Sequence, residues 1–138
     1  MGIGKRSAAR YVFAAVLLAM ATAACASDAE GRVFFEEPRD EAVVVSPVPV
    51  VMGAEGFIIE PASEGVGDGR GHFHIIIDRP CVQPRLTVGA DGEHLHFGGG
   101  QETALLELEP GEHTLCLQVA DGSHTALDLT DEIAIIVE

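Results

Sequence analysis

The fold is decided by residues 71–78, which read Gly-His-Phe-His-Ile-Ile-Ile-Asp. β-branched and aromatic side chains favour strands, and successive side chains of a strand point to opposite faces. The apolar residues at the odd positions from 73 to 77 therefore form a face that packs against a core. His72 and His74 point together to the opposite face. This stretch predicts a strand that carries two imidazoles on one side.

A second run, residues 94–97, reads His-Leu-His-Phe and repeats the His-x-His step. By the same alternation His94 and His96 share one face, and the two apolar residues of the run share the core face. The two runs hold four of the six histidines in the chain. Two pairs of imidazoles on strands of one sheet predict a patch that can converge on a single ligand.

Short strand-like runs broken by Gly, Pro and Asp fill the rest of the chain after residue 31. No segment there has a sustained 3.6-residue apolar period. Pro47 and Pro49 confine their run to a sheet edge or split it. The expected strands are residues 32–35, 42–52, 57–60, 71–78, 85–88, 94–97, 103–108, 113–120 and 132–137. This spacing predicts an all-β fold, a single antiparallel immunoglobulin-like β-sandwich.

The beginning of the chain predicts export. Lys5, Arg6 and Arg10 form a positive n-region, and an uncharged apolar stretch follows at residues 11–24. That stretch is short for a membrane span but fits the apolar core of a signal peptide.

Two exits from the signal are compatible with the small residues that follow. Ala24-Cys25-Ala26 fits a general A-x-A cleavage, and the residues before Cys25 resemble a lipobox that would leave Cys25 acylated. We therefore expect a signal peptide over residues 1–26, a short linker over 27–31 and the sandwich over 32–138. The expected location is the periplasm, or the cell surface as a lipoprotein.

Three cysteines are present, and only Cys81 and Cys116 lie beyond the export signal. A pair in an oxidising compartment predicts one disulfide, and two separate buried thiols are the alternative. If two antiparallel strands place these cysteines opposite each other, paired residue numbers sum to about 197. That register would place the first histidine pair opposite residues 123–125 and bring His124 to the patch.

Charge narrows the range of partners. The whole chain has 8 basic and 22 acidic residues and a net charge of −14, and without the three basic residues of the signal the balance is 5 − 22 = −17. Such a surface repels nucleic acid and anionic lipid headgroups. We expect no nucleic-acid partner, and membrane contact only through a lipid on Cys25. The remaining partners are a metal ion or an unknown envelope ligand.

The most concrete ligand for the histidines is a divalent transition metal. Imidazole suits Cu(II) and Zn(II), and a carboxylate can complete the ligand set. Met52 is the only methionine beyond the signal, which argues against a thioether-rich Cu(I) carrier. The candidate metal ligands are His72, His74, His94, His96, His124 and Asp78.

Other interpretations stay open. The histidines can instead brace loop backbone in an envelope interaction or structural module that binds no metal. His72-x-His74 followed by Asp78 loosely imitates the metal motif of a cupin barrel, although Asp stands where Glu is expected and the glycine spacing differs. We do not expect an enzyme, because no serine lies in a G-x-S-x-G elbow.

The chain resembles a family of exported bacterial proteins, the domain-of-unknown-function family 4399. The resemblance is carried by residues 71–78, 94–103, 110–115 and 121–124, and it extends from about Val33 to Val137. Members of that family often have a third histidine where this chain has Phe73. The resemblance implies a secreted or lipid-anchored β-sandwich, and it brings no established activity.

Overall fold

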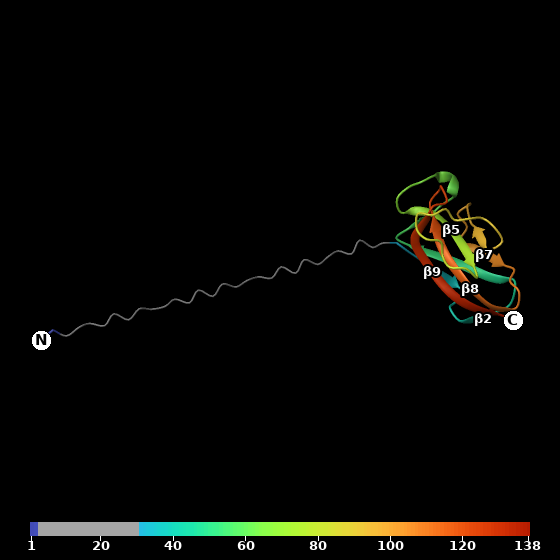
Figure 1. Ribbon diagram of the computed structural model, residues 1–138, viewed down its shortest axis with the longest axis horizontal. Helices are drawn as coiled ribbons and strands as arrows, with labels where there is room; N and C mark the ends of the chain where they lie inside the picture. Colours follow the sequence, from blue (N-terminus) through green and yellow to red (C-terminus); the bar gives the residue numbers. More distant parts are fainter. Residues whose placement is uncertain (3–30) are drawn as a thin grey trace.

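The computed structural model describes residues 1–2 and 31–138, and residues 32–137 form a β-sandwich of two packed sheets (Figure 1). The predicted signal peptide falls almost entirely on residues 3–30, so that segment and Cys25 lie outside the described residues. Within the described ranges, no helix is long and apolar enough to cross a membrane.

The two sheets differ in size. The smaller sheet is antiparallel, with the order β1 (Arg32–Glu37), β3 (Val48–Glu55) and β7 (Thr103–Leu106). The larger sheet has the order β2 (Ala42–Val44), β9 (Ala126–Val137), β8 (Gly111–Ala120), β5 (Arg70–Ile77) and β4 (Ile58–Ile59). β6 (His94–His96) also pairs with β5, and a single 3-10 turn, η1 (Ala62–Glu64), follows β4.

Strand β5 lies inside the larger sheet, with β8 beside it in Figure 1. Its apolar face is the predicted one, because Phe73 and Ile75 are fully buried in the core. They pack there with alternate residues of β8 and with the inner faces of β1 and β3. Burying each such side chain contributes about 1.5–3 kcal/mol, so this face anchors β5 to the core.

Part of the opposite face of the larger sheet is also buried. We call residues 79–93, the segment between β5 and β6, the strap. Val88 of the strap packs against Ala120 and Ala126 on this face, and Val82 packs against these three residues. Gln118, between them and the cysteine of β8, is fully buried. The strap therefore covers the part of this face around Gln118, Ala120 and Ala126.

Cys81 and Cys116 form the predicted disulfide, with Cα atoms 5.6 Å apart. The register inferred from it was wrong by five positions. His72 pairs with Ala120 and His74 with Gln118, so paired numbers sum to 192. The physical reason is that β5 ends at Ile77. Cys81 therefore lies in the strap, and not in a strand paired with β8, where it bonds to Cys116.

Two further details differ from the expected antiparallel sandwich. The run at residues 42–52 is split, as its prolines allowed, and its halves β2 and β3 lie in different sheets. β2 pairs with β9 and β4 pairs with β5 in parallel. The expected strand at residues 85–88 makes only an isolated bridge, between Thr87 and Thr125.

Candidate metal centre

Four histidines meet on the covered face of the larger sheet. His72 and His74 project from β5, and His96 of β6 is the direct cross-strand partner of His74. His124 reaches the same point from the turn between β8 and β9. The six distances between their ring centroids range from 4.7 to 6.1 Å. We call these four residues the histidine cluster.

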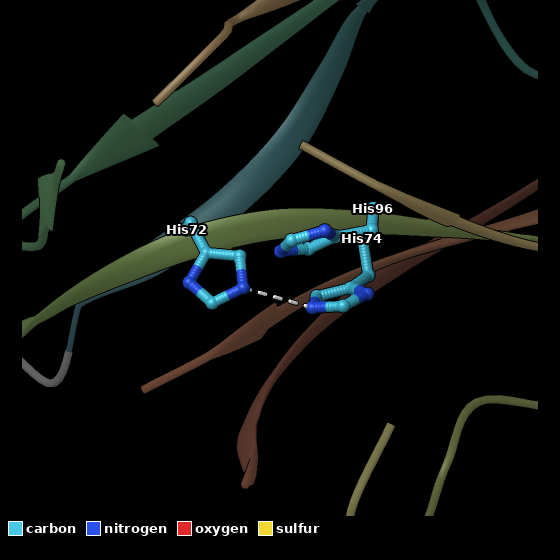
Figure 2. Close-up of side chains that lie close together, drawn as sticks. All are labelled: His72, His74 and His96. Carbon is cyan, nitrogen blue, oxygen red and sulfur yellow. Dashed lines mark hydrogen bonds between the residues drawn. The ribbon is translucent and has the colours of Figure 1, made fainter. Parts of the chain in front are cut away.

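The imidazoles of the cluster contact one another through ring nitrogens. Figure 2 shows the rings of His72, His74 and His96 gathered together, with a hydrogen bond that joins the first two. The Nε2 atoms of His72 and His74 are 3.0 Å apart, and those of His96 and His124 are 3.1 Å apart. His72, His74 and His96 each offer a ring nitrogen within 4.8 Å of the others, close enough to share one ion.

Burial separates the cluster into an inner and an outer pair. His72 and His74 are 0% exposed, and the Nδ1 atom of each lacks a hydrogen-bond partner. His96 is exposed at the surface, and His124 is partly buried. A buried polar atom without a partner costs about 1–3 kcal/mol, and most buried groups in proteins avoid that cost. The inner pair is therefore an expensive arrangement for a structural core.

The cluster keeps its inner imidazoles neutral. Burial, reinforced by the positive charge that neighbouring histidines would carry, lowers the pKa of His74 to about 3 and that of His72 to about 4. Burial also lowers the pKa of His96, with a smaller contribution from His124. Neutral imidazole is the form that binds a metal, so these rings are ready to act as donors at neutral pH.

The turn that carries His124 has an unusual backbone. His124 has a φ of 65°, in the left-handed region that residues with a Cβ adopt at a cost. The Asp121 carboxylate accepts hydrogen bonds from the backbone N–H groups of Ser123 and Thr125, and the backbone N–H of His124 donates to the Asp121 carbonyl. Strained residues held in this way are concentrated at functional sites.

Glycines let two backbones approach the cluster closely. A Cβ on Gly98 would lie 2.2 Å from Cε1 of His96, so a larger residue there would displace that ring. A Cβ on Gly122 would lie 2.2 Å from the Gly65 carbonyl oxygen, which brings the loop after η1 onto the turn of His124. The glycines at residues 98 and 122 thus have a packing role that their sequence pattern did not reveal.

Two of the six predicted ligands are not part of the cluster. His94 has a ring nitrogen 2.9 Å from the Asp91 carboxylate, which also accepts its backbone N–H. Asp78 pairs with His113, with 2.8 Å between its Oδ2 and the ring Nδ1, and it accepts the backbone N–H of Thr114. Asp78 lies four residues beyond His74, about 13 Å along a strand, because each residue advances about 3.3 Å.

His113 lies near the start of β8, away from the histidine cluster, and makes structural hydrogen bonds. Its second ring nitrogen lies 2.8 Å from the Glu109 carbonyl oxygen, so the ring joins a loop to Asp78. The hydrogen bond to the Glu109 carbonyl, together with Asp78, raises the pKa of His113. Both ring nitrogens face acceptors, so His113 has no free donor for a metal.

A second group of potential ligands surrounds the disulfide, where Cys81 and Cys116 lie near Glu132. The two sulfur atoms are bonded to each other, and a disulfide sulfur is not the thiolate that binds metals. Within residues 31–138, the histidine cluster is therefore the group with free nitrogen donors that can hold a first-row transition metal.

The fold and the cluster together define a small β-sandwich with a histidine-lined candidate metal centre. Residues 50–138 match the family model described as Domain of unknown function (DUF4399), and the chain belongs to this family. The match includes every histidine of the cluster. Neither a curated protein nor a solved structure matches the chain.

Proposed function

We propose that this protein is an exported cell-envelope β-sandwich that binds one divalent transition-metal ion, Cu(II) or Zn(II), in the histidine cluster. The observation that carries the proposal is the convergence of four imidazoles, two of them fully buried. Export is supported by the charged and apolar pattern of residues 5–24.

The distances suit a single ion. Two nitrogens bound to one ion at about 2.1 Å are separated by about 3.0 Å at a right angle and about 3.4 Å in a tetrahedron. The Nε2–Nε2 distances of 3.0 and 3.1 Å are close to both values. An ion shared by His72, His74 and His96 would draw together nitrogens that now lie within 4.8 Å of one another.

The chemistry of the donors suits borderline metals. Imidazole favours Cu(II), Zn(II) and Ni(II), whereas Ca(II) and Mg(II) require oxygen ligands. No carboxylate belongs to the group of three histidines found among the described residues. The net charge of −14 adds a favourable field for any cation that approaches the surface.

The competing function is an envelope interaction module whose histidines only brace loops. One observation favours it, because the two Nε2–Nε2 contacts are already hydrogen bonds without an ion. Bracing does not require four imidazoles to converge, two of them fully buried, whereas binding of an ion by nitrogen donors does.

Metal titration of untagged protein tests the proposal. Calorimetry with Cu(II) and Zn(II) should give one site per chain, and His74→Ala and His96→Ala should each weaken binding at least about tenfold by removing a ligand. His94→Ala is the matched control, since it removes a nearby histidine that is bonded to Asp91. Absence of binding to the wild-type protein, or equal loss in the control, would favour the bracing function.

A further inference from the structure

The strap lies over the same sheet face as the histidine cluster and contacts the chain on both sides of His124. We propose that the strap positions His124 as a metal ligand, so that the Cys81–Cys116 disulfide and Gln118, which anchor the strap, act as positioning residues for the site. This inference rests on the proposed metal function. None of the three anchoring residues belongs to the cluster itself.

The beginning of the strap is anchored twice to β8. Cys81 is bonded to Cys116, and the next residue, Val82, is held by the buried amide of Gln118. The Val82 backbone N–H donates to Oε1 of Gln118 over 2.9 Å, and Nε2 of Gln118 donates to the Val82 carbonyl over 2.7 Å. The same Nε2 also lies 3.2 Å from the Leu127 carbonyl oxygen. Gln118 thus ties the strap to both β8 and β9.

The middle of the strap is hydrogen-bonded to His124 and to the residues that follow it. Backbone N–H groups of Arg85 and Ala126 donate to the carbonyls of Ala126 and Leu86, over 2.9 and 2.8 Å. The backbone N–H of Val88 then donates to the carbonyl of His124 itself over 2.9 Å. These hydrogen bonds form a short ladder between residues 85–88 of the strap and residues 124–126. The ladder ends at His124, the residue with the left-handed backbone.

The position of His124 depends on more than its own turn. The Asp121 hydrogen bonds set the local shape of the turn, and the Ala120–Ala126 pair joins its two ends to the sheet. The ladder from the strap and the packing of Val88 against Ala126 add a second support, which acts on the His124 backbone directly. Since His124 has a left-handed backbone, a loosened strap would let this residue relax toward the commoner φ values.

His96 does not share this dependence. It is held by its pairing with His74 in β5, and the backbone N–H of the following residue, Phe97, donates to the Phe73 carbonyl over 3.0 Å. Three of the four proposed ligands therefore lie on the paired strands β5 and β6. The fourth, His124, lies in the turn that the strap contacts. Loss of the strap should convert a four-nitrogen site into a three-nitrogen site.

The test compares untagged wild-type protein with Cys81→Ser/Cys116→Ser and with Gln118→Ala. We expect Cu(II) affinity to fall about 10–100-fold in both variants, as for loss of a supporting group around a metal ligand. The nitrogen hyperfine pattern in electron paramagnetic resonance should change from four coordinated nitrogens to three. Val50→Ala is the control, because it removes buried volume in the smaller sheet and should leave both readouts unchanged.

A double-mutant cycle separates positioning from general destabilisation. His124→Ala should weaken Cu(II) binding in the wild-type background and have little further effect in the disulfide variant. Hydrogen exchange in the metal-free protein gives a second readout, since the Val88 amide should exchange faster when the anchor is removed.

Wild-type affinity with four nitrogens in both strap variants would overturn the inference and leave the metal site intact. An equal effect of His124→Ala in the two backgrounds would also overturn it. Failure of the wild-type protein to bind any metal would instead reject the proposed function. If the disulfide variant does not fold, the Gln118→Ala variant alone tests whether the strap positions His124. This variant removes one side-chain amide and leaves the disulfide in place.

Discussion

Acid should destabilise the metal-free protein through its two fully buried histidines. Burial, and then the neighbouring imidazoles, lower the pKa of His72 to about 4 and that of His74 to about 3, from 6.5 for an ordinary histidine. Between pH 6.5 and 4 the unfolded chain therefore binds more protons than the folded protein. Stability rises with pH wherever the unfolded state binds more protons, so acid must lower it.

The magnitude follows from the same pKa values. At pH 5 each of these imidazoles is almost fully protonated when unfolded and almost fully neutral when folded. At about 1.4 kcal/mol per pKa unit, each imidazole lowers the free energy of unfolding at pH 5 by about 2 kcal/mol relative to pH 7.5. The pair together lowers it by about 4 kcal/mol. Domains are typically stable by only about 5–15 kcal/mol, so this loss is a large share.

Urea unfolding with a chelator at pH 7.5, 6 and 5 measures the effect. His74→Leu replaces one buried imidazole by an apolar side chain and should retain about 2 kcal/mol more stability at pH 5, relative to its own value at pH 7.5. Asp91 does not titrate in this window, because hydrogen bonds with the His94 side chain and with backbone N–H groups lower its pKa to about 2. A wild-type loss of less than about 1 kcal/mol, or an equal loss in the variant, would refute the reasoning.

The other predictions concern single residues elsewhere. His113→Gln should make the loss of unfolding free energy in acid larger in the same titration. The raised pKa of His113 stabilises the folded protein in acid, and this stabilisation disappears as the pH rises through the folded pKa. Gly98→Ala should weaken metal binding in calorimetry by displacing the His96 ring, and Gly92→Ala, which meets open space, should not; equal affinities would contradict this. Metabolic labelling with a lipid precursor should mark the wild-type protein and not Cys25→Ser, if Cys25 is the anchor; an unlabelled soluble form would reject the lipoprotein.

Local sequence patterns predicted the parts of this fold that depend on alternation alone. The apolar face of β5 follows from Phe73 and Ile75, and both are buried as expected. The all-β sandwich and the Cys81–Cys116 disulfide were predicted from strand spacing and from the number of cysteines. These features depend on residues close in sequence, or on a pair with no competing partner.

The features that were missed depend on how distant segments meet. The register failed because Cys81 belongs to the strap, and no local period shows where a strand ends and a covering loop begins. His124 reached the cluster for a different reason than the one predicted, through the turn after β8 and not through strand pairing. His94 and Asp78 have the right side chains in the right phase, but Asp91 and His113 are their hydrogen-bond partners.

The unequal burial of the two histidine pairs has a consequence for kinetics. His72 and His74 are sealed from solvent, whereas His96 is exposed and His124 is partly so. An ion that arrives from solvent must meet the outer imidazoles first, and an ion that leaves must pass them last. Substitution of an outer imidazole should therefore change both the affinity for the ion and the rate at which the ion is exchanged with a chelator or a second protein. Substitution of an inner imidazole removes a ligand but leaves the outer path to solvent in place, so it should change the affinity more than the path of exchange.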